Sequence, residues 1–199
     1  MSLTDVTFGV GGEGYMYAYY KNIKGFLNKA DCENLISHAK ALPDGAKYIE
    51  TGTFMGVSAH LVAMNSTATV WCHDIWALTS NIVPEECPSE CFFEFYKCVS
   101  DNSLQNRVIP VTGNSLKTVS IHADQSIDLA FVDGDHSYEG ALGDFRNVLP
   151  KMKKGGVILA HDCAPGSDCM RAMTDFTHET GLSFKILTGT SGMAKIDVV

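Results

Sequence analysis

Residues 128–162 read DLAFVDGDHSYEGALGDFRNVLPKMKKGGVILAHD. The stretch contains two short apolar runs, and between these runs the apolar residues recur at helical spacing. Apolar runs that alternate with helical patterns are typical of β-α-β units around a parallel sheet. The segment predicts strands over 127–134 and 156–162, with a helix over 138–152 between them. Each apolar run ends in acidic or histidine side chains, which are costly to bury without a partner.

The same alternation extends over the whole chain. Five further runs predict strands at 47–52, 69–75, 107–113, 183–189 and 192–199, and four further patterns predict helices at 31–42, 57–65, 89–102 and 169–180. Asp31 is the expected N-cap of the first helix. Only TGTSG joins the last two strands, which is too short for a crossover helix, so an antiparallel hairpin is expected at the sheet edge.

Length and composition predict one globular domain. The 199 residues are 45% hydrophobic and 19% charged, and the formal net charge is −8. A negative average field disfavours nucleic acid as a partner. The N-terminus lacks the features of a signal peptide and no apolar stretch is long enough for a membrane span, so a cytoplasmic protein without a membrane partner is expected. An odd count of seven cysteines favours reduced thiols over disulfides or zinc.

The segment YIETGTFMGVSAHLV, residues 48–62, predicts a nucleotide-binding turn. A strand that carries Glu50 is followed by Gly52, Thr53, Gly56 and Ser58 and then by a helix. Glycine lets a backbone approach a ligand closely, and a helix N-terminus offers unpaired N–H groups to an anion. The spacing is not the G-x-G-x-x-G of dinucleotide-binding proteins, which disfavours an NAD-linked oxidoreductase without excluding it.

Two later strand ends carry further candidate cofactor contacts. Asp74 is placed to accept hydrogen bonds from ribose hydroxyls, although it could instead cap a turn. Ile75 and Trp76 offer apolar surface for an adenine ring, with simple packing equally compatible for Trp76. Asn114 and Ser115 follow the third strand, where they suit the edge nitrogens of adenine.

These motifs resemble the class I S-adenosylmethionine-dependent methyltransferases. The nearest group includes macrocin-type and related sugar O-methyltransferases and homologues from cephalosporin biosynthesis. The resemblance covers roughly residues 30–199, and its most specific element is the block from residue 128 to residue 162 quoted above. It implies a Rossmann-like fold with a seven-stranded, mostly parallel sheet, an antiparallel last strand and helices on both faces. Asn114 departs from the family, in which many members carry Asp.

The strand ends at Asp133, His161 and Asp162 should converge on one crevice, because the carboxyl ends of parallel strands meet at one edge. Asp133 is therefore a candidate for both cofactor and metal binding, and the resemblance places all three residues at metal-ligand positions. Magnesium or manganese is the expected ion, although histidine suits manganese, iron or zinc better than magnesium. Asp135 is the favoured general base, with His136 second. Helix and turn capping by the aspartates, or a metal-free reaction, remain alternatives.

The sequence therefore predicts an S-adenosylmethionine-dependent methyltransferase domain over 26–199, with residues 1–25 as a candidate lid. The acceptor is expected to be a small-molecule hydroxyl such as a sugar or a phenol, and a homo-oligomer is left open. The irregular stretches 9–14 and 79–90 are candidates for gating the site. Two alternatives stand beside this prediction: an NAD-linked oxidoreductase on a similar sheet, and a methyltransferase-like binding module without turnover.

Overall fold

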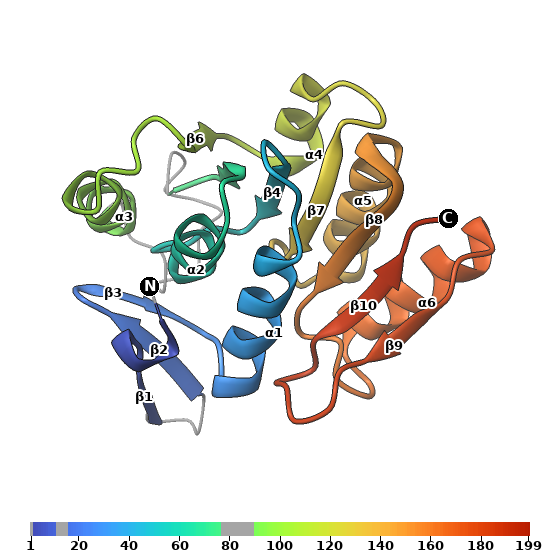
Figure 1. Cartoon of the computed structure of the whole chain (residues 1–199). Coiled ribbons are helices and arrows are strands. Elements are labelled where there is room, and N and C mark those ends of the chain that lie inside the picture. The colour runs from blue at the N-terminus through green and yellow to red at the C-terminus, as the bar shows by residue number, and fades with distance from the viewer. Residues whose placement is uncertain (1, 11–15, 77–89) are drawn as a thin grey trace.

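The computed structural model describes residues 2–10, 16–76 and 90–199 and shows an α/β fold around one large sheet (Figure 1). The strands are β1 Thr7–Val10, β2 Met16–Tyr20, β3 Ile23–Gly25, β4 Lys47–Thr51, β5 Thr69–Asp74, β6 Val108–Thr112, β7 Ile127–Val132, β8 Met152–Ala160, β9 Phe184–Ile186 and β10 Ala194–Asp197. The α-helices are α1 Lys29–Lys40, α2 Val57–Asn65, α3 Glu90–Asp101, α4 Ser115–Thr118, α5 Tyr138–Val148 and α6 Asp168–Thr180. Short 3-10 helices cover Leu3–Asp5, Val119–Ile121 and Leu149–Lys151.

The large sheet in the described residues has seven strands in the order β6-β5-β4-β7-β8-β10-β9. Strands β4 to β8 run parallel, and β10 is antiparallel to both of its neighbours. The predicted seven-stranded sheet with its antiparallel closing hairpin is confirmed. One edge strand is the three-residue β9, and the other is β6, which contains Pro110.

Side chains of alternate strand residues pack into two hydrophobic cores, one on each face of the sheet. Tyr48 and Phe131 pack with residues of α1, α2 and α3. Ile49, Ala130 and Val132 pack on the opposite face with residues of α5 and α6. Side chains of consecutive strand residues point to opposite faces, so strands buried on both sides read as continuous apolar runs. Helices therefore cover both faces, as predicted.

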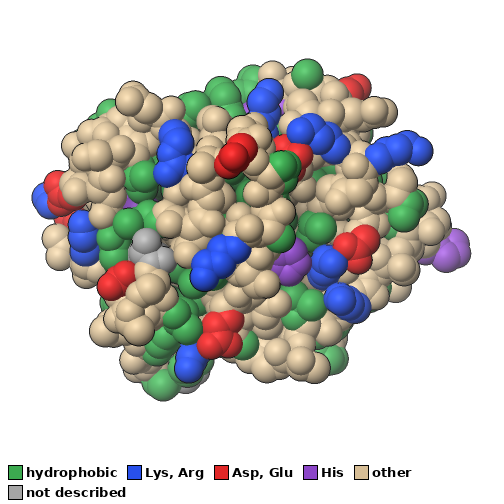
Figure 2. Space-filling view, in the orientation of Figure 1, with side chains coloured by type: hydrophobic (Ala, Val, Ile, Leu, Met, Phe, Trp, Pro, Cys, Tyr) green, Lys and Arg blue, Asp and Glu red, His purple; other side chains and the backbone are tan. Residues whose placement is uncertain are grey.

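The first 25 residues, in which no sequence motif was found, contribute a small antiparallel sheet in the order β1-β2-β3 (Figure 1). Val6, Ala18, Tyr20 and Ile23 from this segment are buried in the same core as α1, α2 and α3. Figure 2 shows hydrophobic side chains at the surface over this sheet, at the lower left. The predicted gating stretches fall largely outside the described residues, which omit 11–15 and 77–89.

Two local predictions are wrong. Asp31 is not the N-cap of the first helix, because α1 begins at Lys29 and Asn28 is the cap, its side chain accepting from the Asp31 N–H. Asp31 is instead the third helical residue and completes a capping box with Asn28. The helix predicted over 138–152 ends at Val148, since Pro150 lies in a 3-10 turn and Met152 already starts β8.

None of the helices in the described part of the chain combines the length and the apolar character that crossing a bilayer requires. The six described cysteines are all buried, and no disulfide joins any two of them.

Gly52 lies where the ends of β4 and β7 come closest. Its φ is +81°, and a Cβ atom there would lie 1.8 Å from the backbone oxygen of Asp133. The Asp133 N–H donates to the Thr51 carbonyl at 2.9 Å, so the two chain segments are locked together on either side of this point. Only glycine fits, because any side chain would have to displace a neighbouring backbone.

We expect Gly52→Ala to lower the free energy of unfolding by about 2 to 5 kcal/mol, because it adds a backbone clash to the strain of positive φ. Urea denaturation of the variant measures this loss. The matched control is Gly155→Ala, since Gly155 has a φ of +79° and no described atom lies within 4 Å of the position that its Cβ would take. The control should lose only about 1 kcal/mol from φ strain. Equal losses in the two variants would contradict the clash.

Candidate active site

Four neighbouring parallel strands, β5, β4, β7 and β8, end at the same edge of the sheet. At these ends the chain carries Asp74, Gly52, Asp133 and His161 respectively. Ligand sites in open α/β sheets form at this edge, in the crevice between strand ends. The topology therefore brings the polar residues predicted from sequence to one side of the molecule.

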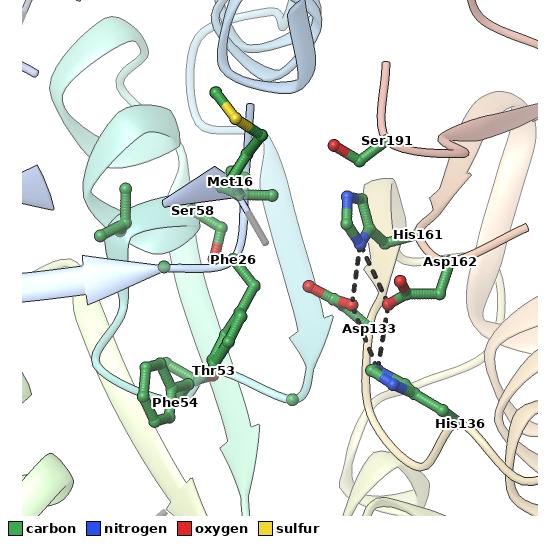
Figure 3. A pocket seen from close by; sticks show the side chains of 14 residues that line it. Met16, Phe26, Thr53, Phe54, Ser58, Asp133, His136, His161, Asp162 and Ser191 are labelled. Atoms are coloured by element: carbon green, nitrogen blue, oxygen red, sulfur yellow. Dashed lines mark hydrogen bonds and ion pairs between the residues drawn. The ribbon is translucent and has the colours of Figure 1, made fainter. Parts of the chain in front are cut away.

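A cavity of about 330 Å³ lies at this edge (Figure 3). One wall carries the glycine-rich turn after β4, with Gly52, Thr53, Phe54, Val57 and Ser58, together with Met16, Gly25, Phe26 and Leu27 from the N-terminal part of the chain. The facing wall carries Asp133, His136, His161, Asp162 and Ser191. Gly52 and Asp133, which lie far apart in the sequence, thus share one cavity.

The polar wall is a cluster of carboxylates and imidazoles. His136 Nε2 lies 3.2 Å from Asp162 Oδ2 and 3.6 Å from Asp133 Oδ1. His161 Nδ1 lies 3.1 Å from Asp162 Oδ2 and 3.6 Å from Asp133 Oδ1. The two carboxylates therefore sit between two imidazole rings, which is the convergence that the strand ends predicted.

Burial and neighbouring charges shift the pKa values of these four groups in different directions. Burial raises the pKa of Asp133 above its usual value, against the opposing effect of His161. Burial also acts on Asp162, but the hydrogen bond and charge of His161 outweigh it and lower the pKa of Asp162. The hydrogen bond with Asp133 raises the pKa of His136. Burial opposes charge on His161, yet Asp133, Asp162 and Asp31 raise its pKa well above the ordinary value.

The glycine-rich turn presents backbone and small polar groups to the cavity. Gly56, with a φ of +80°, is the N-cap of α2, and a Cβ there would meet the Phe95 ring at 2.4 Å. Gly56 does not line the cavity, but it permits the turn that places Thr53 and Ser58 there. The Thr53 hydroxyl is buried in this wall, close to the Glu50 carboxylate.

Glu50 lies beneath this turn and is fully buried. The Tyr48 hydroxyl donates to Glu50 Oε2 at 2.7 Å, whereas Glu50 Oε1 has no hydrogen-bond partner in the described part of the chain. Burial raises the pKa of Glu50 from 4.5 to about 7, although the Tyr48 hydrogen bond opposes the shift. Glu50 is therefore enclosed beneath the turn, close to the Thr53 and Ser58 side chains.

Asp74 ties the turn to the end of β5. Its Oδ2 accepts from the Phe54 N–H at 2.7 Å and its Oδ1 accepts from the Trp76 N–H at 2.8 Å. Trp76 is 3% exposed, stacks on Phe95, and donates its indole N–H to the Phe54 carbonyl. The Trp76 ring is therefore part of the core, which was the alternative to adenine contact. Neither Asp74 nor Ile75 lines the cavity.

The remaining predicted residues lie outside the cavity lining. Asn114 caps α4 and accepts from the Leu116 N–H, and Ser115 donates to the buried Asp144. Asp135 accepts from the Ser137 N–H at 2.9 Å and so stabilises the turn before α5, whose N-cap is Ser137. The predicted general base Asp135 thus has a local structural contact, whereas His136 faces the cavity (Figure 3).

Sequence reasoning missed the apolar wall and one buried acid. Met16 and Phe26 carried no motif and are brought to the cavity by the N-terminal sheet, and Phe54 lies in the glycine-rich segment but was not singled out. Asp31, expected only as a helix cap, lies 3.4 Å from His161 Nε2. An acidic residue in the first turn of a helix is interpreted as a helix cap in any sequence, so no local signal predicts the contact of Asp31 with His161.

Comparison with known proteins points to one family. The sequence family described as a methyltransferase domain matches residues 49–163. An uncharacterized protein of Sinorhizobium fredii, y4gI, is 46% identical over 39 residues, a match that covers 20% of this chain and only 4% of that protein.

Solved structures share the fold. The O-methyltransferase NovP superposes with a TM-score of 0.71 at 16% identity, covering 91% of this chain and 84% of that one. A putative S-adenosyl-L-methionine-dependent methyltransferase of Methanococcus maripaludis gives a TM-score of 0.64 at 16% identity, with 85% and 83% covered. A geranyl diphosphate methyltransferase in complex with S-adenosylmethionine gives 0.60 at 11% identity, with 85% of both chains covered.

We expect Glu50 to make the unliganded protein less stable as the pH rises. The folded state holds the Glu50 proton up to a pKa of about 7, whereas the unfolded chain releases it near 4.5. The folded state therefore binds more protons between these values, and stability falls across them. Glu50→Gln should match the wild type near pH 4 and exceed it at pH 8 by on the order of 3 kcal/mol in urea denaturation. The exposed Glu139→Gln serves as control, and an equal change there would refute the assignment.

Proposed function

This chain belongs to the methyltransferase-domain family, and we propose that it transfers the methyl group of S-adenosylmethionine to a hydroxyl group of a small molecule. The observation that carries this proposal is the cavity in which the glycine-rich turn faces the carboxylate–histidine cluster. A methyl donor held at the turn would have its reacting end directed at the groups that can activate an acceptor.

The turn supplies the donor side of the site. Gly52 allows close backbone approach, and Thr53 and Ser58 bring small polar side chains to this wall. Asp74 lies outside the cavity and holds the turn in place by accepting from the Phe54 N–H. S-adenosylmethionine supplies a methyl group on a positively charged sulfonium. The acids Asp133 and Asp162 on the facing wall favour that charge electrostatically. Alignment of donor and acceptor in one cavity can lower the barrier by roughly 7 to 11 kcal/mol.

His136 is the cavity residue best placed to remove the acceptor proton. Its side chain is 58% exposed, and its Nε2 faces Asp133 and Asp162. The carboxylates orient the ring and would stabilise the imidazolium that forms when it accepts a proton. This assignment replaces Asp135 as the favoured base, because Asp135 does not line the cavity.

The same cluster fits a divalent cation. Asp133, His136 and Asp162 each offer one ligand atom, and these atoms lie within 4.8 Å of one another. With an ion bound, His136 would be a ligand, so its role as base belongs to the metal-free reaction. Carboxylate oxygens suit magnesium or manganese, and the imidazole shifts the preference toward manganese. His161 was expected as a ligand, but both of its ring nitrogens already face carboxylates. We therefore propose that His161 holds the ligand carboxylates in position and does not bind the ion itself. A bound ion would lower the pKa of a coordinated hydroxyl.

The lining of the cavity favours an acceptor with an apolar part. Met16, Phe26 and Phe54 contribute the apolar wall, against which a phenol ring or the apolar face of a sugar could lie. The name of the fold relative NovP as an O-methyltransferase agrees with a hydroxyl acceptor.

S-adenosylhomocysteine should stabilise the protein, whereas NAD should not. At a ligand concentration of about 100 times Kd, binding adds about 2.7 kcal/mol, which raises Tm by roughly 5 to 10 °C for a domain of this size. Thermal denaturation with each ligand measures the difference. A shift with NAD and none with S-adenosylhomocysteine would favour the oxidoreductase alternative, and binding without methyl transfer to any hydroxyl acceptor would favour the binding module.

Removing divalent ions with EDTA should abolish methyl transfer, and Mn²⁺ should restore it, if the cluster works with a metal. Asp133→Asn should also weaken Mn²⁺ binding, measured by calorimetry, by about tenfold or more. Asp135→Asn is the matched control, because Asp135 has no ligand atom in the cluster. Full activity in EDTA would exclude the metal and leave His136 as the base.

A further inference from the structure

Asp31 is a buried acid that the proposed reaction does not yet use. It lies in the first turn of α1 and is 0% exposed. Its Oδ2 accepts from the Asn28 N–H at 2.8 Å, and its Oδ1 accepts from the Ser191 N–H at 3.1 Å. A charged carboxylate without solvent needs such partners.

The same carboxylate faces the polar wall of the cavity. Asp31 Oδ2 lies 3.4 Å from Nε2 of His161, whose side chain is only 3% exposed. The other nitrogen of that ring, Nδ1, lies 3.1 Å from Asp162 and 3.6 Å from Asp133. Asp31, His161 and the two cavity carboxylates thus form a continuous chain of charged groups from helix α1 to the cavity.

A helix cap alone does not account for this arrangement. At this third helical position a glutamine could also accept from the Asn28 N–H and close the capping box, but it would not place a carboxylate beside a buried imidazole. Asp31 and His161 Nε2 lie at ion-pair distance without the geometry of a hydrogen bond, and a carboxylate at that distance favours one orientation of the ring by charge attraction. In that orientation Nδ1 faces Asp133 and Asp162.

We propose that Asp31 is a positioning residue for methyl transfer, which holds the His161 ring so that Nδ1 orients the Asp133 and Asp162 carboxylates toward the acceptor. The inference rests on the proposed function. Through Ser191, which lines the cavity, Asp31 also ties the turn before β10 to the same cluster. Asp31 itself does not line the cavity, so it acts on the acceptor side through His161.

The test is Asp31→Asn, which keeps the side-chain size and an oxygen for the Asn28 N–H but removes the charge. We expect kcat to fall about 10- to 100-fold and Mn²⁺ affinity, measured by calorimetry, to fall by a similar factor. Affinity for S-adenosylhomocysteine should stay unchanged, because the glycine-rich turn is not touched. The control Asn28→Ala loses the cap and keeps the carboxylate, so it should lower Tm and leave kcat unchanged.

A second comparison holds even if Asp31→Asn alone folds poorly. His161→Gln removes the ring through which Asp31 acts, so the double variant Asp31→Asn/His161→Gln should have the same kcat as His161→Gln. A further tenfold drop in the double variant, or wild-type kcat in Asp31→Asn, would overturn the inference while the proposed function stands. A wild-type protein that binds no S-adenosylhomocysteine would instead overturn the proposed function and this inference with it.

Discussion

The close backbone contact between the ends of β4 and β7 is the constraint on which the site depends. A Cβ on Gly52 would lie 1.8 Å from the Asp133 carbonyl oxygen, so the turn after β4 passes directly over the end of β7. Parallel pairing of these central strands fixes their direction, and the absence of a side chain at Gly52 lets their ends come this close. The glycine-rich turn and the carboxylate cluster consequently open onto one cavity instead of two. Every role assigned to the cavity residues presupposes that distance.

Pairing with histidines explains how three acids are accommodated at the carboxyl ends of the buried strands. Asp31, Asp133 and Asp162 surround His161, and His136 closes the cavity side of the group. Burying a charge without a partner is costly, whereas alternating carboxylates and imidazoles stabilise one another. The arrangement is asymmetric, because His161 is enclosed and His136 is largely exposed. The exposed His136 can exchange protons with solvent or with a ligand, whereas the enclosed His161 can only hold its neighbours in place.

Sequence predicted the sheet and the meeting of Asp133 with His161 and Asp162, because apolar runs define the strands and parallel strands end together. It could not predict contacts that depend on distant segments. Asp31 meets Ser191 across 160 positions, and a local pattern shows only the helix turn in which it lies. Asp135 follows Asp133 at strand spacing, but the strand has ended, so its side chain turns back to Ser137. In sequence, Trp76 is equally compatible with adenine contact and with core packing, and only its stacking on Phe95 of α3 shows that the ring is enclosed.

The edge strand β6 has a consequence for association between molecules. Backbone N–H groups alternate in direction along a strand, and that of Gly113 donates to Asp74 of β5, so position 110 faces away from the sheet. Pro110 has no N–H to offer there, and the opposite edge strand, β9, has only three residues. Proline and short length at sheet edges discourage the addition of strands from other chains. Unpaired strand edges can template association between chains, and in the described residues both edges of this sheet are blunted.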